Sequence, residues 1–151
     1  MDTEATTPRL SARDNPRPGR DSGTVAGRDA VLVRLPAVSA YLSILRTTVA
    51  GLAARLDFTL DEIEDLRIAI DEACAMLLGR AIPGTDLECE FELTDQAMDI
   101  TVTAVTIDGR VPGQHTFSWA VLTALAGHVE TAAGDDGRVT IRLVKQRGPS
   151  S

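Results

Sequence analysis

The segment FTLDEIEDLRIAIDEAC, residues 58–74, carries the clearest structural signal in this chain. Thr59 is followed three residues later by Glu62, the spacing of a capping box, in which each side chain bonds the other residue's backbone at a helix N-terminus. Apolar residues then recur at spacings of three and four as far as Leu77. The sequence therefore predicts an amphipathic helix that begins at the cap and ends before Pro83.

The polar side of this helix raises a question, because the acidic pair Asp71-Glu72 interrupts an otherwise apolar run. Steps of seven and four residues return to nearly the same direction on a helix, so Asp65, Glu72 and Met76 lie together beside the buried stripe. A carboxylate at such a boundary is either solvated or ion-paired, or it serves a chemical purpose. The residues alone leave both explanations open.

The flanking segments predict an α+β fold. Apolar alternation indicates strands at residues 30–37, 87–94, 98–106 and 137–145, with a short hairpin link between the second and third. Further helices are expected at residues 38–56 and 116–129, the latter with Ser118 as a possible cap and Gly127 near its end. Clustered strands with separate helices favour a two-layer α+β sandwich over a doubly wound parallel sheet.

The chain of 151 residues suits one folded domain, which we place at residues 30–146. Residues 1–29 are rich in Pro, Gly, Ser, Thr and mixed charges and have little to bury, so they are predicted to form a disordered arm. Its scattered arginines leave weak contacts open as an alternative to a solvated tail. Residues 147–151 are expected to fray.

The net charge of -7 falls entirely on residues 30–151, because residues 1–29 contain five arginines and five acidic residues. An acidic domain repels phosphate backbones, which argues against direct nucleic-acid binding and suits a basic protein partner. No apolar run approaches the roughly 20 residues of a membrane span, and no signal-peptide core is found at the N-terminus. We therefore expect a cytoplasmic protein that does not contact a membrane.

The sequence offers no convincing metal site. Cys74 and Cys89 lie fifteen residues apart without a CxxC motif, and His115 and His128 cannot complete a ligand set with them. Because both cysteines fall within predicted elements, they are expected to be small buried hydrophobic residues of a reducing compartment.

The segment at residues 58–74 resembles the region of the N-box helix in the GHKL-type ATP-binding fold. More narrowly, it is similar to the RsbW/SpoIIAB family of anti-sigma factors. TFSWAVLTALAGHVET, residues 116–131, is close to the actinobacterial UsfX branch of that family. The likeness covers nearly all of residues 30–146, and it implies a mixed, mainly antiparallel sheet covered by helices.

The resemblance implies an ATP-dependent kinase that phosphorylates a serine of a STAS-domain partner. In the family, the N-box helix carries a Glu that acts as a base and, four residues later, an Asn that binds Mg²⁺. Here Glu72 occupies the base position and Met76 the Asn position. A thioether is a soft, weak ligand and does not replace an amide oxygen on Mg²⁺.

Two other nucleotide motifs are altered as well. The family Asp that binds adenine aligns with Ala104, and Asp108 is at most a displaced remnant of it. The glycine-rich turn before the last helix aligns with Thr116, Phe117 and Ser118, whose side chains occupy space that close backbone approach to phosphates requires. The combination predicts poor ATP binding, with ATP and Mg²⁺ as cofactors only if the family activity persists.

The partner-binding side is better preserved. In the family, the first helix supplies a basic residue to the face that binds the sigma factor or the anti-anti-sigma protein, and Arg46 aligns with it. An ordinary exposed arginine on the polar side of a helix remains an equal alternative. By analogy with the family, a homodimer is also expected.

Three functions remain in competition. The first is an anti-sigma factor that sequesters an alternative sigma factor of the stress or sporulation type and is released by a STAS-domain antagonist. The second is an active serine kinase with Glu72 as its base. The third is a sensor whose altered pocket, lined by Met76, Ala104 and Phe117, binds a ligand other than ATP.

Overall fold

The computed structural model describes residues 29–148. The predicted arm before Asp29 and residues 149–151 of the predicted tail lie outside this range. Along the chain the elements are β1 (Asp29–Pro36), the short 3-10 helix η4 (Ser39–Tyr41), α1 (Leu42–Arg55), α2 (Leu60–Leu78), β2 (Asp86–Leu93), β3 (Ala97–Val105), α3 (Phe117–Ala126), β4 (His128–Ala133) and β5 (Arg138–Gln146).

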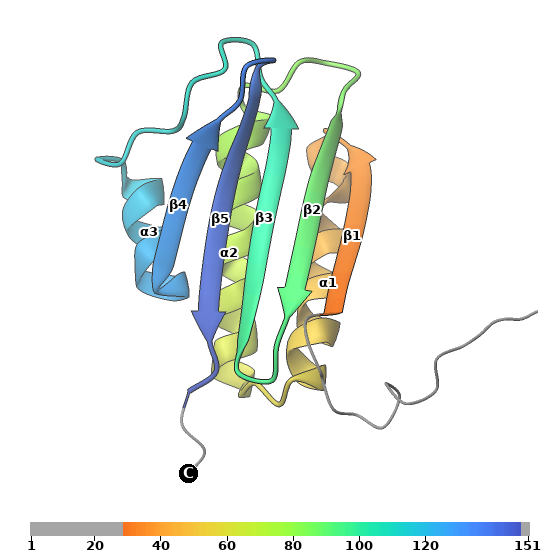
Figure 1. Cartoon of the computed structure of the whole chain (residues 1–151), viewed down its shortest axis with the longest axis vertical. Helices are drawn as coiled ribbons and strands as arrows, with labels where there is room; N and C mark the ends of the chain where they lie inside the picture. The colour runs from red at the N-terminus through yellow and green to blue at the C-terminus, as the bar shows by residue number, and fades with distance from the viewer. Residues whose placement is uncertain (1–28, 149–151) are drawn as a thin grey trace, which may run out of the picture.

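The strands form one sheet in the order β1-β2-β3-β5-β4, in which all neighbours are antiparallel. Helices α1 and α2 lie behind the sheet in Figure 1, and α3 lies beside them behind β4, so no helix or strand of residues 29–148 covers the opposite face of the sheet. The predicted two-layer α+β architecture is therefore confirmed.

The core lies between the sheet and the helices. Every second residue of the central strands points toward the helices and is buried, as the period of two in a strand requires. From the helix layer, α2 contributes the longest buried stripe: Leu66, Ala69, Ile70, Ala73, Cys74 and Leu77. Because this stripe is anchored in the core, the remaining faces of α2 are held at defined positions on the surface.

The capping box at the start of α2 is confirmed. The Thr59 N–H donates to Glu62 Oε1 at 2.8 Å, and the Glu62 N–H donates to Thr59 Oγ1 at 3.1 Å. The other oxygen of Glu62 accepts the Gly148 N–H at 2.7 Å. The bond from the Thr59 N–H, and then that from Gly148, hold the pKa of Glu62 below its ordinary value. The first turn of α2 is thereby tied to the end of the described chain.

The predicted third helix was too long, and a fifth strand was missed. Helix α3 ends at Ala126, because Gly127 adopts a φ of 94°, which residues other than glycine rarely adopt. His128–Ala133 then forms the edge strand β4 and pairs with β5. Its sequence, HVETAA, has exposed alanines and little apolar alternation, so its strand character depends on hydrogen bonds to β5.

Within residues 29–148, no helix combines the length and the apolar character that crossing a membrane requires.

Candidate functional site

The residues predicted for nucleotide binding lie in the C-terminal half of α2, at the end of β3, in the loop that follows β3 and at the start of α3. There the chain that follows α2 meets the end of β3, where the Ile82 N–H donates to the Val105 carbonyl at 2.9 Å and Ala81 forms a bridge with Thr106. The loop of residues 107–116 leaves the sheet at the same end and leads into α3 (Figure 1). Helix α3 packs against α2.

Glu72 and Met76 occupy different environments although they are one turn apart. The Glu72 side chain is half-buried, and its carboxylate has no hydrogen-bond or ion-pair partner among residues 29–148. Met76 is also half-buried, but it packs against the hydrophobic core. Within the described residues the carboxylate is thus not engaged by any other side chain, whereas the methionine contributes to packing.

Ala104 lies inside the core. It is 1% exposed, and it stands on β3 between Leu87 of β2 and Val139 of β5. Phe117, by contrast, is 83% exposed. Ala104 is therefore buried in the core whereas Phe117 projects from the surface, and a ligand site lined by both stays a prediction.

Asp108 is engaged by a neighbouring arginine. Its Oδ2 accepts a hydrogen bond from Arg80 Nη2 at 2.6 Å, and its Oδ1 accepts the Arg110 N–H at 3.1 Å. The bond from Arg80 is the main reason why the pKa of Asp108 lies below its usual range. Since Arg80 follows α2, this carboxylate ties the loop to the end of that helix.

The cap of α3 is Thr116, and the prediction of Ser118 was wrong. Thr116 Oγ1 accepts the Trp119 N–H at 3.1 Å and donates to the Gly113 carbonyl at 3.3 Å. Thr116 has the extended backbone of an N-cap, whereas Ser118 already lies within the first turn and is half-buried. A capping side chain therefore stands at the N-terminus of α3, directly after the loop that follows β3.

The other half of the acidic pair, Asp71, makes an ion pair with Arg46 of α1. Arg46 Nη1 donates to Asp71 Oδ1 at 2.9 Å and to Oδ2 at 3.0 Å. The Arg46 side chain is 36% exposed and that of Asp71 is 40% exposed, so the pair lies at the surface of the helical layer. Arg46 is the predicted contact residue, and its pairing with Asp71 could not be predicted from local spacing because the two lie 25 residues apart.

Asp65, the third residue predicted on the side of α2 that bears Glu72 and Met76, also has a tertiary partner. Lys145 of β5 places its Nζ 3.5 Å from Asp65 Oδ2 and donates a hydrogen bond to the Leu125 carbonyl at 2.8 Å. Lys145 therefore connects α2, the last turn of α3 and the sheet, a structural role that sequence spacing does not reveal.

The two cysteines are buried free thiols. Burial, and secondarily the charge of Asp71, raise the pKa of Cys74 to about 12. Burial also raises the pKa of Cys89 well above its usual range. Because the thiolate is the reactive form, both residues are poor candidates for oxidation or metal binding. Within residues 29–148 no group of three or more His, Cys, Asp or Glu side chains is placed to hold a metal ion.

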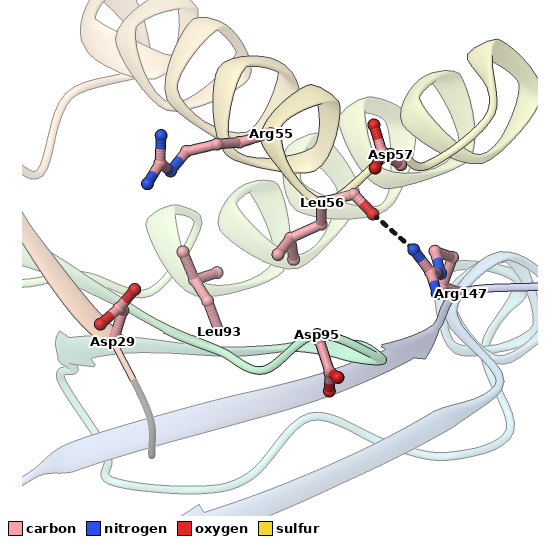
Figure 2. A pocket seen from close by; sticks show the side chains of 7 residues that line it. All are labelled: Asp29, Arg55, Leu56, Asp57, Leu93, Asp95 and Arg147. Atoms are coloured by element: carbon pink, nitrogen blue, oxygen red, sulfur yellow. Dashed lines mark hydrogen bonds between the residues drawn. The ribbon is translucent and has the colours of Figure 1, made fainter. Parts of the chain in front are cut away.

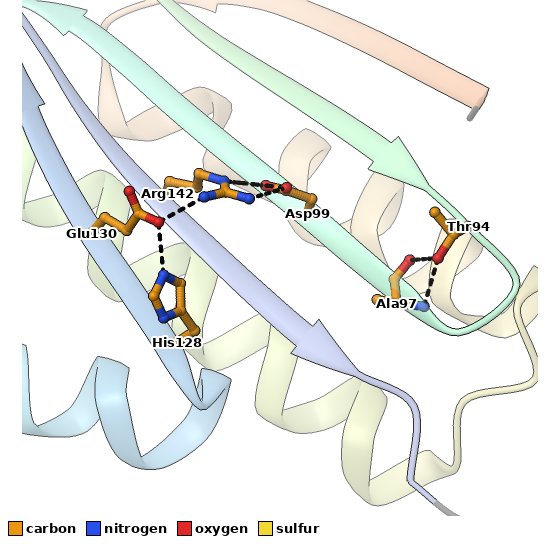
Figure 3. Close-up of polar contacts among 6 residues, drawn as sticks. All are labelled: Thr94, Ala97, Asp99, His128, Glu130 and Arg142. Atoms are coloured by element: carbon orange, nitrogen blue, oxygen red, sulfur yellow. Dashed lines mark hydrogen bonds and ion pairs between the residues drawn. The ribbon is translucent and has the colours of Figure 1, made fainter. Parts of the chain in front are cut away.

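The uncovered face of the sheet carries a chain of ion pairs (Figure 3). Arg142 of β5 donates from Nε and Nη2 to Asp99 of β3, at 2.9 and 2.7 Å for the shortest contacts, and from Nη1 to Glu130 at 2.6 Å. Glu130 also contacts His128 Nε2 at 2.7 Å. The hydrogen bond from His128 is the largest of the effects that lower the pKa of Glu130. These contacts connect three neighbouring strands.

A shallow pocket of about 280 Å³ lies at the opposite end of the fold from the loop of residues 107–116, where α1 ends (Figure 2). Its only internal hydrogen bond in Figure 2 runs from Arg147 Nη1 to the Leu56 carbonyl, at 3.3 Å. The lining residues are Asp29, Arg55, Leu56, Asp57, Leu93, Asp95 and Arg147. Its mixed charges identify no ligand class.

No family model matches the chain. Individual relatives nevertheless identify its family. A Mycobacterium tuberculosis protein named anti-sigma-F factor RsbW is 34% identical over 129 residues, which cover 85% of this chain and 73% of the relative. Serine-protein kinase RsbW of Halalkalibacterium halodurans is 37% identical over 76 residues, 50% of this chain and 47% of the relative. The Bacillus subtilis protein of the same name is 48% identical over 46 residues, 30% of this chain and 29% of the relative.

A solved structure agrees with this result. The crystal structure of the RsbU and RsbW domains of a Mycobacterium tuberculosis protein matches with a TM-score of 0.63 over 81% of this chain and 34% of that one, at 17% identity. At that identity the likeness shows the fold, and it confirms the predicted GHKL-type architecture. The chain belongs to the RsbW family of anti-sigma factors and serine-protein kinases.

Proposed function

We propose that this protein is an anti-sigma factor that acts by sequestration. It binds an alternative sigma factor of the sigma-F class through the outer face of α1 and α2, and a STAS-domain anti-anti-sigma protein releases it by competing for that face. The observation that carries the proposal is the match over 129 residues to a relative named anti-sigma-F factor. The surface position of Arg46 is in keeping with it.

The charge of the domain supports this proposal. The formal charge of the chain is -7, and residues 1–29 contribute nothing to it. Sigma factors present basic surfaces to DNA, so an acidic domain attracts them at long range and repels DNA itself. Action in the cytoplasm, as a homodimer and without direct DNA contact, is part of the proposal.

The nucleotide side supports sequestration without catalysis. Met76 is used in packing, Ala104 offers no carboxylate, and Thr116 caps a helix. Asp108 is bonded to Arg80 and would have to give up that ion pair to bind a ligand. These residues do not fit a magnesium–nucleotide complex, because no hard oxygen ligand follows Glu72 on α2.

One observation favours a second candidate, the active kinase. The half-buried Glu72 carboxylate has no partner in residues 29–148, as a base that must accept a proton from a substrate hydroxyl requires. Several relatives are named serine-protein kinases. In this alternative, Glu72 acts as the base on a serine of the STAS partner.

Two titrations with purified protein distinguish these functions. In the first, the chain is titrated with the sigma-F-class sigma factor of its source organism, and sequestration predicts a stable complex without nucleotide. In the second, Mg-ATP is added up to millimolar concentration with the organism's STAS partner, and phosphate transfer is followed. Transfer that disappears in Glu72→Ala would establish the kinase. No binding of the sigma factor would overturn the anti-sigma proposal.

A further inference from the structure

The geometry of the Arg46–Asp71 pair is asymmetric. Only Nη1 of Arg46 contacts the carboxylate, and it donates to both oxygens. Among residues 29–148, Nε and Nη2 of Arg46 have no hydrogen-bond partner. The edge of a guanidinium formed by Nε and Nη2 offers two parallel donors and binds planar acceptors such as carboxylates most strongly. The structure therefore leaves the stronger edge of Arg46 open.

Arg142 on the uncovered face of the sheet shows the contrasting arrangement. Its Nε and Nη2 both donate to Asp99, and its Nη1 donates to Glu130 (Figure 3). Both edges of that guanidinium are occupied within the chain, so it connects strands and has no free edge to offer a partner. The difference between the two arginines lies in which nitrogen faces the carboxylate.

We propose that Asp71 is a positioning residue for partner binding. By holding Nη1, it fixes the Arg46 side chain at the surface of the helical layer and presents the Nε–Nη2 edge to the docking protein. This inference rests on the proposed function, because it assumes that Arg46 contacts the sigma factor.

The position of Asp71 in the fold suits this role. Three residues close to Asp71 in the chain are fully buried: Ile70, Ala73 and Cys74. The backbone that carries the carboxylate is thus anchored in the core. An arginine side chain loses considerable rotational freedom when it is immobilised at an interface. Asp71 imposes part of this restriction before the partner arrives, which lowers the remaining entropic cost of binding.

Affinity measurements on five forms of the full chain test the inference, with the sigma-F-class factor of the source organism as the titrant. We expect Asp71→Ala to weaken binding about 5- to 10-fold, the effect of releasing one rotamer-rich side chain. Asp71→Glu, which restores a carboxylate, should recover most of the loss. The double variant Arg46→Ala/Asp71→Ala should bind no more weakly than Arg46→Ala alone, since Asp71 acts only through Arg46.

A matched variant on the sheet face provides the control. Asp99→Ala removes the same charge from another arginine–carboxylate pair and should leave the affinity unchanged. Thermal unfolding of each variant verifies that it is folded. If Asp71→Ala does not fold, Asp71→Asn, which keeps the shape and loses the charge, replaces it in the same titration.

The outcomes separate the inference from the proposed function. Wild-type affinity in a folded Asp71→Ala or Asp71→Asn, together with weakened binding in Arg46→Ala, would overturn the positioning role and leave the anti-sigma function standing. Weaker binding by the double variant than by Arg46→Ala alone would show that Asp71 touches the partner itself, which would also overturn the positioning role. Absence of any binding by the wild type would overturn both.

Discussion

Asp71 and Glu72 are neighbours in the chain, carry the same charge and are both half-buried, yet they belong to different surfaces. Asp71 points toward α1, where Nη1 of Arg46 contacts both its oxygens. Glu72 lies about 100° further round the helix, and its carboxylate has no polar partner within residues 29–148. One turn beyond it, Met76 is packed against the core.

Under the proposed function, one helix keeps a partner-binding side while its nucleotide-binding side differs. On the side of Asp71, the charged pair with Arg46 is complete and reaches the surface. On the side of Glu72, the carboxylate has no polar partner within residues 29–148, and the other candidate residues take part in packing, capping and an ion pair within the protein. Because successive residues of a helix face different directions, substitutions on one side need not disturb the other.

Substitution on the buried face of α2 is expected to give the largest effect, a loss of folding stability. Ile70 is 0% exposed, so Ile70→Ala removes buried methyl groups and leaves a cavity, which should lower the free energy of unfolding by about 2–5 kcal/mol. Ile68→Ala on the same helix, at 43% exposure, should cost much less. Urea denaturation of the two variants checks this, and equal losses would contradict the burial described here.

Reversing the charge on the partner side should weaken sigma-factor binding next most strongly. Arg46→Glu places a carboxylate beside Asp71 and removes the open guanidinium edge, at an expected cost of about 1–3 kcal/mol in binding. Arg142→Glu makes the same charge change on the sheet face and should leave affinity nearly unchanged. If Arg46→Glu binds as tightly as the wild type, Arg46 is an ordinary surface residue.

The capping box at the N-terminus of α2 should make a smaller, pH-dependent contribution to folding stability. Bonds from the Thr59 and Gly148 N–H groups lower the folded-state pKa of Glu62 below its ordinary 4.5. The ionised carboxylate therefore stabilises the fold above about pH 4.5, and this contribution is lost as the pH falls through the lower folded pKa. Since Glu62 is partly exposed, we expect about 1 kcal/mol or less.

Denaturation of wild type and Glu62→Gln across the range from pH 3 to pH 7 measures this effect. The difference between the two proteins should be largest near neutrality and should shrink as the pH falls below about 4.5. A difference that stays constant across the range would show that the charge of Glu62 is irrelevant to the cap.

The smallest expected effect compares the two neighbours directly. Asp71→Ala breaks a half-exposed ion pair and should cost up to about 1 kcal/mol of unfolding free energy. Glu72→Ala removes a carboxylate that has no partner in residues 29–148, so stability should change by less than about 0.5 kcal/mol. Thermal unfolding at low and high salt distinguishes them, because only the cost of Asp71→Ala should fall with added salt.

Much of the fold was predictable because its signals are local. The capping box joins residues three apart, and the buried stripe of α2 and the alternation of the central strands follow fixed periods. Strand β4 was not predictable in this way, because its sequence has little apolar alternation and its strand conformation depends on hydrogen bonds to β5. The cap of α3 was misplaced by two residues because Thr116 and Ser118 are both good caps, and only the backbone conformation distinguishes them.

The sequence by itself determined the layer architecture and the family, because these depend on residue type, spacing and order. Only the tertiary structure decided which carboxylates are paired. Asp71 meets Arg46, Asp65 approaches Lys145, and Asp108 meets Arg80 across separations of 25, 80 and 28 residues. Such contacts depend on how helices and strands pack, and no local pattern distinguishes these carboxylates from that of Glu72, which has no partner within residues 29–148.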